Sequence, residues 1–219
     1  MHRTDTLTLN ITNGEYFNSY FKSKFEGEAV PFCEAIMDGA VTTNIFSEEF
    51  IQLRSKELQV SEQEYRAKMY AYDALSRNTY ETICLWFGKD TFCQVNLLTL
   101  LAFLEQIEYK GKLILNYICD ENFEVLESDI DVRLGGYGKI YQDVLVSKVM
   151  PKEVGVLYAR AIDLYFDYHS EDGILANLVR DNSDKNEMEL VKLLLEQSKE
   201  YGLSDLQAMR LINTYLYRT

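Results

Sequence analysis

The chain has 219 residues, 47% of them hydrophobic and 13% aromatic, which is enough apolar material for a substantial core and excludes an intrinsically disordered protein. Its formal net charge is −13 and its basic residues form no runs, which argues against nucleic-acid binding through a basic patch. No apolar stretch approaches the roughly 18 residues of a membrane span. The start, MHRTDTLTLN, has no apolar signal core, so we expect a cytoplasmic protein without membrane contact.

In the first third of the chain the hydrophobic pattern alternates between strands and helices. Residues 6–12 (TLTLNIT) alternate apolar and polar side chains, which predicts a half-buried strand. Residues 15–25 place four aromatic side chains on one helical face, and residues 28–32 (EAVPF) predict a second short strand. From Ser47 to about Arg77 the pattern is helical and strongly charged. Ser61 and Glu64 there have the spacing of a capping box.

The middle of the chain predicts two further strands around one very apolar helix. TICLWF (82–87) and KLILNYIC (112–119) are the strands, and the second of them is apolar on both faces, as a central parallel strand is. The helix between them, from about Phe92 to Ile107, is apolar almost all round, so we expect other elements to cover it on more than one side.

This alternation predicts an α/β fold: an open, mostly parallel, Rossmann-like sheet of four strands or slightly more, with helices on both faces. We assign it to residues 1–125, with a helical insertion at about 45–78. After Asp120 the strand signal fades, and residues 126–219 are expected to form an α-helical region packed on the sheet. Helical patterns there cover residues 154–169, 187–201 and 206–217. The expected caps are Asp184 with Glu187, Gly202, and Ser204 with Gln207.

Four cysteines are spread widely along the chain. None of them forms a C-x-x-C pair, so the sequence predicts neither a zinc knuckle nor a redox pair. We expect reduced, mostly buried thiols at Cys33, Cys84, Cys93 and Cys119.

Three segments, each following one of the first three strands, resemble a bacterial family known as domain of unknown function 1835. They are NITNGE (10–15), PFCEAIMDGAV (31–41) and LWFGKDTFCQVNLL (85–98). In that family the strands look to be followed by Asn-Gly-Asp, by Pro-Trp-Arg-Asp with His-Glu-Gly-Pro, and by Leu-Trp-Phe ending in Asp and Gln. The likeness covers about the first 125 residues. It implies an α/β fold and no established activity.

The chain also departs from the family pattern. The matching residues are Asn13, Gly14, Trp86, Phe87, Asp90 and Gln94. Cys33 stands at the arginine position, Met37 at the histidine position, and Lys89 where another histidine often occurs. If the family performs acid–base chemistry through those residues, this member has lost it.

The turns after these three strands should meet at one edge of the sheet. In open α/β sheets, ligands bind beyond the carboxyl ends of the strands, where the strand order switches. Glycines there permit close backbone approach, and each following helix offers free N–H groups. The candidate ligand-binding residues are Asn13, Gly14, Glu15, Glu34, Asp38, Gly39, Trp86, Lys89, Asp90 and Gln94.

Each of these residues also has a purely structural interpretation. Asn13 and Asp90 have the right type and position to cap the helices that follow them. Trp86 is expected to anchor the core with its N–H satisfied, and Lys89 to pair with a neighbouring carboxylate. Gln94 should be buried, so its amide needs partners from loop backbone or from a ligand.

Four of the candidates are carboxylates: Glu15, Glu34, Asp38 and Asp90. If they converge, they raise one another's pKa or recruit a cation, and oxygen ligands suit magnesium, manganese or calcium better than zinc. A metal site at these four residues is therefore an alternative to simple capping and solvation. The sequence specifies no cofactor.

Two weaker patterns lie in the second half of the chain. RLGGYGK (133–139) has glycines beside basic residues and could cradle a phosphate, but it lacks the P-loop spacing, so a flexible loop is the favoured interpretation. The last two helical patterns loosely resemble a helix-turn-helix. The final one carries no base-reading cluster, which disfavours DNA binding.

The sequence leads to two functional hypotheses. The first is a non-catalytic module that binds a small polar ligand at an acidic site on the sheet edge, with the helices contacting a partner or a second copy of the chain. The alternative is a divalent-metal-assisted hydrolase or transferase acting on a phosphate-bearing substrate. Because no nucleophile motif is present, the non-catalytic module is the main hypothesis.

Overall fold

The computed structural model describes residues 7–77 and 79–217. Residue 6, the first residue of the first expected strand, lies outside these ranges. So do residues 1–5, on which the expectation of no signal sequence was partly based. The strands are β1 (Thr8–Asn13), β2 (Glu28–Phe32), β3 (Thr82–Phe87), β4 (Lys112–Ile118) and β5 (Val125–Val132). The longer helices are α1 (Gly14–Lys24), α2 (Glu48–Glu57), α5 (Thr91–Gln106), α7 (Ala159–Tyr168), α8 (Ile174–Asp181), α9 (Glu187–Gln197) and α10 (Asp205–Ile212). The shorter ones are α3 (Glu62–Lys68), α4 (Tyr70–Ser76) and α6 (Tyr137–Tyr141), with a 3₁₀ turn at Lys199–Tyr201.

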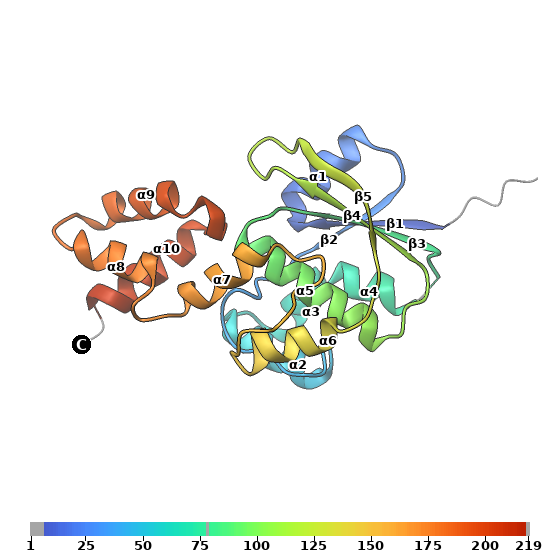
Figure 1. The fold of residues 1–219 in the computed structure, drawn as a ribbon, viewed down its shortest axis with the longest axis horizontal. Coiled ribbons are helices and arrows are strands. Elements are labelled where there is room, and N and C mark those ends of the chain that lie inside the picture. The colour runs from blue at the N-terminus through green and yellow to red at the C-terminus, as the bar shows by residue number, and fades with distance from the viewer. Residues whose placement is uncertain (1–6, 78, 218–219) are drawn as a thin grey trace, which may run out of the picture.

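The five strands form one open sheet in the order β2-β1-β3-β4-β5, in which only β5 is antiparallel to its neighbour. The chain moves from β1 outward to β2 and then returns past β1 to β3. Since crossovers are right-handed, this reversal places α1 on one face of the sheet and helices α2 to α6 on the other. Figure 1 shows this arrangement, with α1 alone above the sheet. The predicted α/β fold class is therefore confirmed.

Helix α5 is the centre of the larger core. From Thr91 to Leu104 nearly every residue is buried, because the sheet, α6 and α7 all pack against it. This agrees with the all-round apolar pattern in the sequence. On the other face a smaller core joins Phe17 and Phe21 of α1 to Ile118 of β4.

Strand β5 lies where we expected the strand signal to end. It is one of the two edge strands and pairs only with β4. Most of its residues are exposed and several are acidic. Charged side chains are a common feature of edge strands, where they discourage pairing with other chains. They also remove the apolar alternation by which a strand is recognised in a sequence. This is why the prediction ended the sheet at about residue 125, although β5 continues to Val132.

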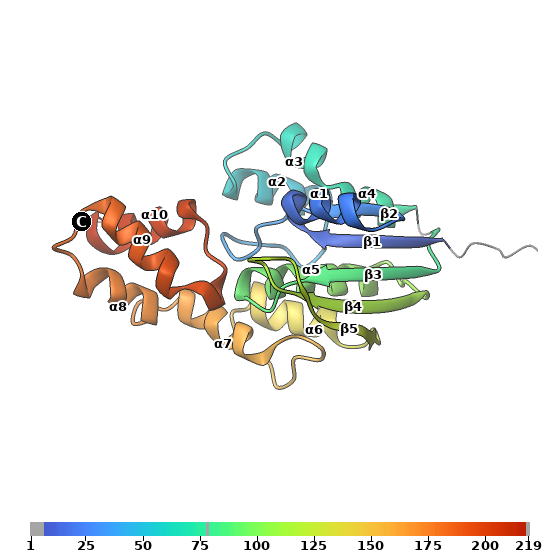
Figure 2. The same cartoon turned by 90° about the horizontal axis from the view of Figure 1, so that it is seen from above.

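The C-terminal region is helical, as expected, but its boundaries differ. Helix α7 begins at Ala159 rather than at residue 154, and α8 was not anticipated. Asn186 with Glu189, not Asp184 with Glu187, caps α9, whereas the capping boxes at Ser61 and Ser204 are as predicted. Helices α8, α9 and α10 form a group to one side of the sheet, with α7 lying between (Figures 1 and 2). No helix in the described ranges combines the length and apolar character needed to cross a bilayer.

The glycine-rich segment at 133–139 is ordered around a carboxylate of the chain itself. Glu105, near the end of α5, accepts hydrogen bonds from the backbone N–H groups of Gly135, Tyr137 (3.0 Å) and Gly138 (2.8 Å). The N–H groups that could have cradled a phosphate are thus already bound to Glu105. The segment is therefore neither a free phosphate-binding loop nor a loop without contacts. Its hydrogen bonds to Glu105 hold the start of α6 against α5.

Replacing Glu105 with alanine should lower the free energy of unfolding by about 1–3 kcal/mol, because three N–H groups lose a charged acceptor. Urea denaturation followed by tryptophan fluorescence measures this. Glu196→Ala is the control, since Glu196 has only an exposed pair with Lys192 and should change stability by less than about 0.5 kcal/mol. Equal effects of the two substitutions would contradict a structural role for Glu105.

Candidate functional site

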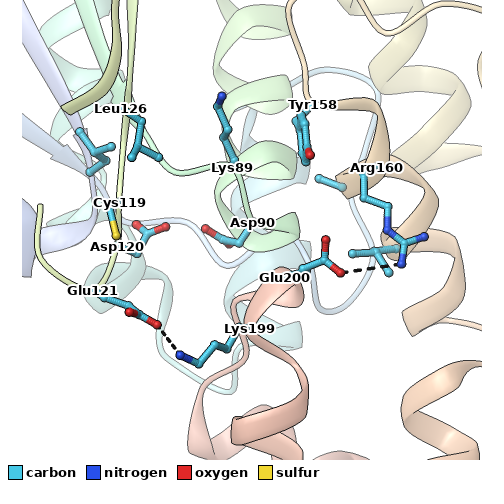
Figure 3. Close-up of a pocket in the computed structure, with 13 residues that line it drawn as sticks. Lys89, Asp90, Cys119, Asp120, Glu121, Leu126, Tyr158, Arg160, Lys199 and Glu200 are labelled. Atoms are coloured by element: carbon cyan, nitrogen blue, oxygen red, sulfur yellow. Dashed lines mark hydrogen bonds and ion pairs between the residues drawn. The ribbon is translucent and has the colours of Figure 1, made fainter. Parts of the chain in front are cut away.

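A cavity of about 320 Å³ lies beyond the carboxyl ends of β3 and β4, next to the switch in strand order. On the sheet side it is lined by Lys89 and Asp90, which follow β3, and by Cys119, Asp120 and Glu121, which follow β4 (Figure 3). Strands of a parallel sheet end at the same edge, so the two turns are brought together by the sheet alone.

The opposite wall comes from the C-terminal region. Tyr158 and Arg160 stand at the start of α7, and Lys199 and Glu200 belong to the 3₁₀ turn after α9. The cavity therefore lies between the sheet edge and the C-terminal helices (Figure 3). This wall was not foreseen from sequence, because it is formed by residues 68 to 110 positions further along the chain than Asp90.

Two carboxyl groups meet in this cavity. Asp120 Oδ2 and Asp90 Oδ2 both lie over the α-carbon of Gly88, where an added Cβ would be 1.9 Å from the first and 2.7 Å from the second. Only glycine fits there. Although Asp120 is exposed as a whole residue, its carboxyl group is packed on Gly88, and Figure 3 shows it pointing toward Asp90.

Partial removal from water, a hydrogen bond with Asp90 and the charge of Asp90 raise the pKa of Asp120 to about 8. At neutral pH the Asp120 carboxyl group therefore holds a proton. Asp90 also caps α5, since its Oδ1 accepts the N–H of Cys93 at 2.9 Å. The capping role expected for Asp90 is confirmed, and it coexists with a place in the cavity.

The Cys93 thiol completes a cluster behind the two carboxyls. A carboxylate oxygen of Asp90, the Sγ of Cys93 and a carboxylate oxygen of Asp120 all lie within 4.8 Å of one another. Burial, followed by the charges of Asp90 and Asp120, raises the pKa of Cys93 well above its usual value, so it is a neutral thiol. Its Sγ accepts a hydrogen bond from Asn13 Nδ2 at 2.8 Å.

Asn13 does not cap α1, contrary to our expectation. Its amide instead bridges Cys93 and Asn96, whose Nδ2 donates to Asn13 Oδ1 at 3.1 Å. This bridge ties the end of β1 to α5 across the switch in strand order. Gly14, with φ of +82°, provides the backbone turn into α1 beside it.

The basic residues at the cavity already have acidic partners. Arg160 pairs with Glu200 at 3.8 Å and Lys199 with Glu121 at 2.6 Å. Lys89 pairs with Glu127 at 3.3 Å, as expected of a lysine beside carboxylates, and its Nζ lies 4.8 Å from the centre of the Tyr117 ring.

Trp86, which is half-buried, and Gln94, which is fully buried, both have structural roles. Trp86 packs on Phe21 of α1, with ring centres 5.2 Å apart, and its Nε1 donates to Asn10 Oδ1 at 3.0 Å, so the expected core anchor is confirmed. Gln94 is fully buried; its Nε2 donates to Gly88 O at 2.6 Å and its Oε1 accepts from the Tyr158 N–H at 2.8 Å. Loop backbone thus satisfies both ends of the amide.

The four carboxylates proposed as a metal site do not come together. Glu15 is exposed and pairs with Lys68 at 2.8 Å, while Glu34 is buried against Arg54. Asp38 accepts a hydrogen bond from Tyr168 on another side of the fold. The predicted metal site at these four residues is therefore wrong, because Glu15, Glu34 and Asp38 form separate ion pairs. The acidic neighbour of Asp90 is Asp120, which was not among the predicted site residues. The signal was available, since Asp120 directly follows the fourth strand.

Glu34 belongs to a buried clamp that holds the loop after β2. Arg54 and Glu34 have fully buried side chains with Nη2 and Oε2 3.2 Å apart, and Tyr65 donates to the other carboxylate oxygen. Arg54 also donates to the carbonyls of Ala35 (2.9 Å) and Asp38 (2.7 Å). This explains why Glu34 is inaccessible to a ligand.

A second depression, of about 410 Å³, lies on the Asp38 side of α7. Asp38 accepts from Tyr168 Oη at 2.8 Å and pairs with Arg210 of α10 at 3.4 Å, and Gly39 lies beside it. The contacts of Asp38 with Tyr168 and Arg210 join the C-terminal helices to the loop after β2.

Comparisons with models of known protein families, with curated proteins and with solved structures find no match for this chain. The resemblance to domain of unknown function 1835 therefore stays a prediction.

Arg54→Met should lower the free energy of unfolding by about 3–5 kcal/mol, because it leaves the buried Glu34 carboxylate without its cation. Urea denaturation of this variant, of Glu34→Gln and of the double variant Glu34→Gln/Arg54→Met measures the effect. The double variant should be more stable than Arg54→Met alone, since it removes the unpaired charge. A double variant with the summed loss of both single variants would contradict the clamp.

The raised pKa of Asp120 predicts a pH-dependent stability. Between the usual aspartate value near 4 and about 8, the folded chain holds a proton that the unfolded chain has released. The free energy of unfolding should therefore fall as pH rises from 5 to 8. Urea unfolding at several pH values should show a shallower fall for Asp120→Asn than for the natural chain. Identical slopes for the two proteins would exclude the shared proton.

Proposed function

We propose that the protein is a small-ligand-binding module whose site is the cavity between the sheet edge and the C-terminal helices. The observation that carries the proposal is the charge arrangement of the cavity. Lys89, Arg160 and Lys199 pair with acidic residues, whereas Asp90 and Asp120 face one another and form no ion pair with a basic side chain of the described residues.

The proposed ligand is small, polar and positively charged. A divalent cation or an organic amine placed at Asp90 and Asp120 would displace the shared proton and be attracted by both carboxylates. The cavity volume, about 320 Å³, suits a small molecule. The absence of a nucleophile motif in the sequence favours binding without catalysis.

The test is thermal melting in the presence of Mn²⁺, Mg²⁺, Ca²⁺ or butane-1,4-diamine, each added separately. A cation at about 100 times its dissociation constant stabilises the fold by about 2.7 kcal/mol, which raises Tm by about 5–10 °C. The shift should increase from pH 6 to pH 8.5, because the proton on Asp120 competes with the cation.

Asp90→Asn and Asp120→Asn should each weaken the apparent affinity by about tenfold or more, since each removes one carboxylate charge. Asp131→Asn is the matched control, because Asp131 is an exposed acid of β5 and does not line the cavity. If no cation gives a shift, or if the control variant loses it equally, the proposal fails.

A metal-assisted hydrolase or transferase remains the second candidate, favoured by one observation. Asp90, Cys93 and Asp120 could ligate one ion, and the thiol extends the possible metals from manganese to softer ions such as zinc. Lys89, Arg160 and Lys199 could then exchange their acidic partners for a phosphate group. Hydrolysis of p-nitrophenyl phosphate with Mn²⁺ or Zn²⁺, abolished in Asp120→Asn, would support catalysis.

A further inference from the structure

The first turn of α5 contacts both the cavity and the C-terminal helices. Thr91 Oγ1 donates to the Glu200 carbonyl at 3.2 Å, and Gln94 Oε1 accepts the N–H of Tyr158 at 2.8 Å. Both side chains are fully buried. The start of α7 and the 3₁₀ turn after α9 are therefore fixed to the same helical turn that begins at Asp90.

Asp90 itself is the third contact. Gly202, which ends the 3₁₀ turn with φ of +68°, lies so close that an added Cβ would be 2.1 Å from Asp90 Oδ1 and 3.1 Å from Phe92 Cβ. The Asp90 carboxylate thus has one oxygen against Gly202 and the other beside Asp120. A movement of the Asp90 carboxylate therefore changes its contacts with both Gly202 and Asp120.

We infer that ligand binding in the cavity changes the mobility of the C-terminal helices through Asp90. This residue lines the cavity and its carboxylate packs against Gly202. The inference rests on the proposed ligand site and adds to it a conformational output. A cation held between Asp90 and Asp120 restrains the Asp90 carboxylate, and the segment packed on it, Lys199 to Gly202, becomes less mobile. Loss of the cation reverses the effect.

The helices have a second attachment that is independent of this contact. On the other side of α7, Asp38 pairs with Arg210 and accepts from Tyr168. A change at Asp90 therefore alters how the helices sit on the sheet without releasing them, so variants at Gly202 should still fold.

The experiment is hydrogen–deuterium exchange of the full chain, followed by mass spectrometry on peptides covering residues 158–164 and 199–202. Gly202→Ala should speed exchange in both regions, because its methyl group collides with Asp90. Gly136→Ala is the matched control: its φ is also positive, at +99°, but an added Cβ there meets no atom within 4 Å. It should leave both regions unchanged.

A rescue variant separates the contact from backbone strain. In Asp90→Ser/Gly202→Ala the shorter side chain still caps α5 and leaves room for the new methyl group, so exchange should return toward that of Asp90→Ser alone. If Gly202→Ala behaves like Gly136→Ala, or if serine at position 90 gives no rescue, the coupling through Asp90 is wrong.

The effect of ligand binding is tested by measuring hydrogen–deuterium exchange of the natural chain with and without Mn²⁺. Slower exchange in 199–202, with no change around Gly136, supports the coupling. If Mn²⁺ raises Tm but leaves exchange in 199–202 unchanged, the coupling is overturned while the proposed binding site stands. If Mn²⁺ produces no melting shift, manganese binding is rejected, and the inference that a bound manganese ion acts on the C-terminal helices is rejected with it, whatever the Gly202 variants show.

Discussion

The first turn of α5 is the constraint on which the rest of the arrangement depends. α5 is a buried helix, yet its first turn carries the polar side chains of Asp90, Thr91 and Gln94. Buried polar groups without partners cost free energy, so each must be satisfied by a defined atom. Asp90 accepts the N–H of Cys93 in α5 itself, whereas the partners of Thr91 and Gln94 are backbone groups of the β3 turn, the start of α7 and the segment after α9. One helical turn thereby fixes three segments that are far apart in the sequence.

The same turn determines the chemistry of the cavity. Gly88 lacks a side chain, and its α-carbon is the surface on which the carboxyl groups of Asp90 and Asp120 meet. Two carboxylates at this distance cannot both be ionised at low cost, so the pair retains a proton at neutral pH. The acidic character of the site therefore comes from a local contact between two residues. It does not follow from the overall charge of −13.

Charged side chains elsewhere in the molecule stabilise the fold. Arg54 and Glu34 neutralise each other inside the fold, and Glu105 saturates the N–H groups before α6. In both cases a pattern that resembles a ligand site in the sequence, an acid after a strand or a glycine-rich turn, is occupied by a partner from the same chain. Residue type and spacing alone do not distinguish these contacts from a site that is open to a ligand.

Hydrophobic periodicity determined β1 to β4, the buried helix α5 and the helical C-terminal region, because burial on one or two faces leaves a repeat that is visible along the chain. The exposed edge strand β5 and the short helix α8 leave weaker repeats and were missed. The sequence also placed Asp90 correctly at the sheet edge, since parallel strands end together. Only the tertiary structure decided that Asp90 faces Asp120 and Gly202, while Glu15, Glu34 and Asp38 pair elsewhere. The physical reason is that the partner of a carboxylate depends on distances between segments remote in sequence, and these distances are set by packing.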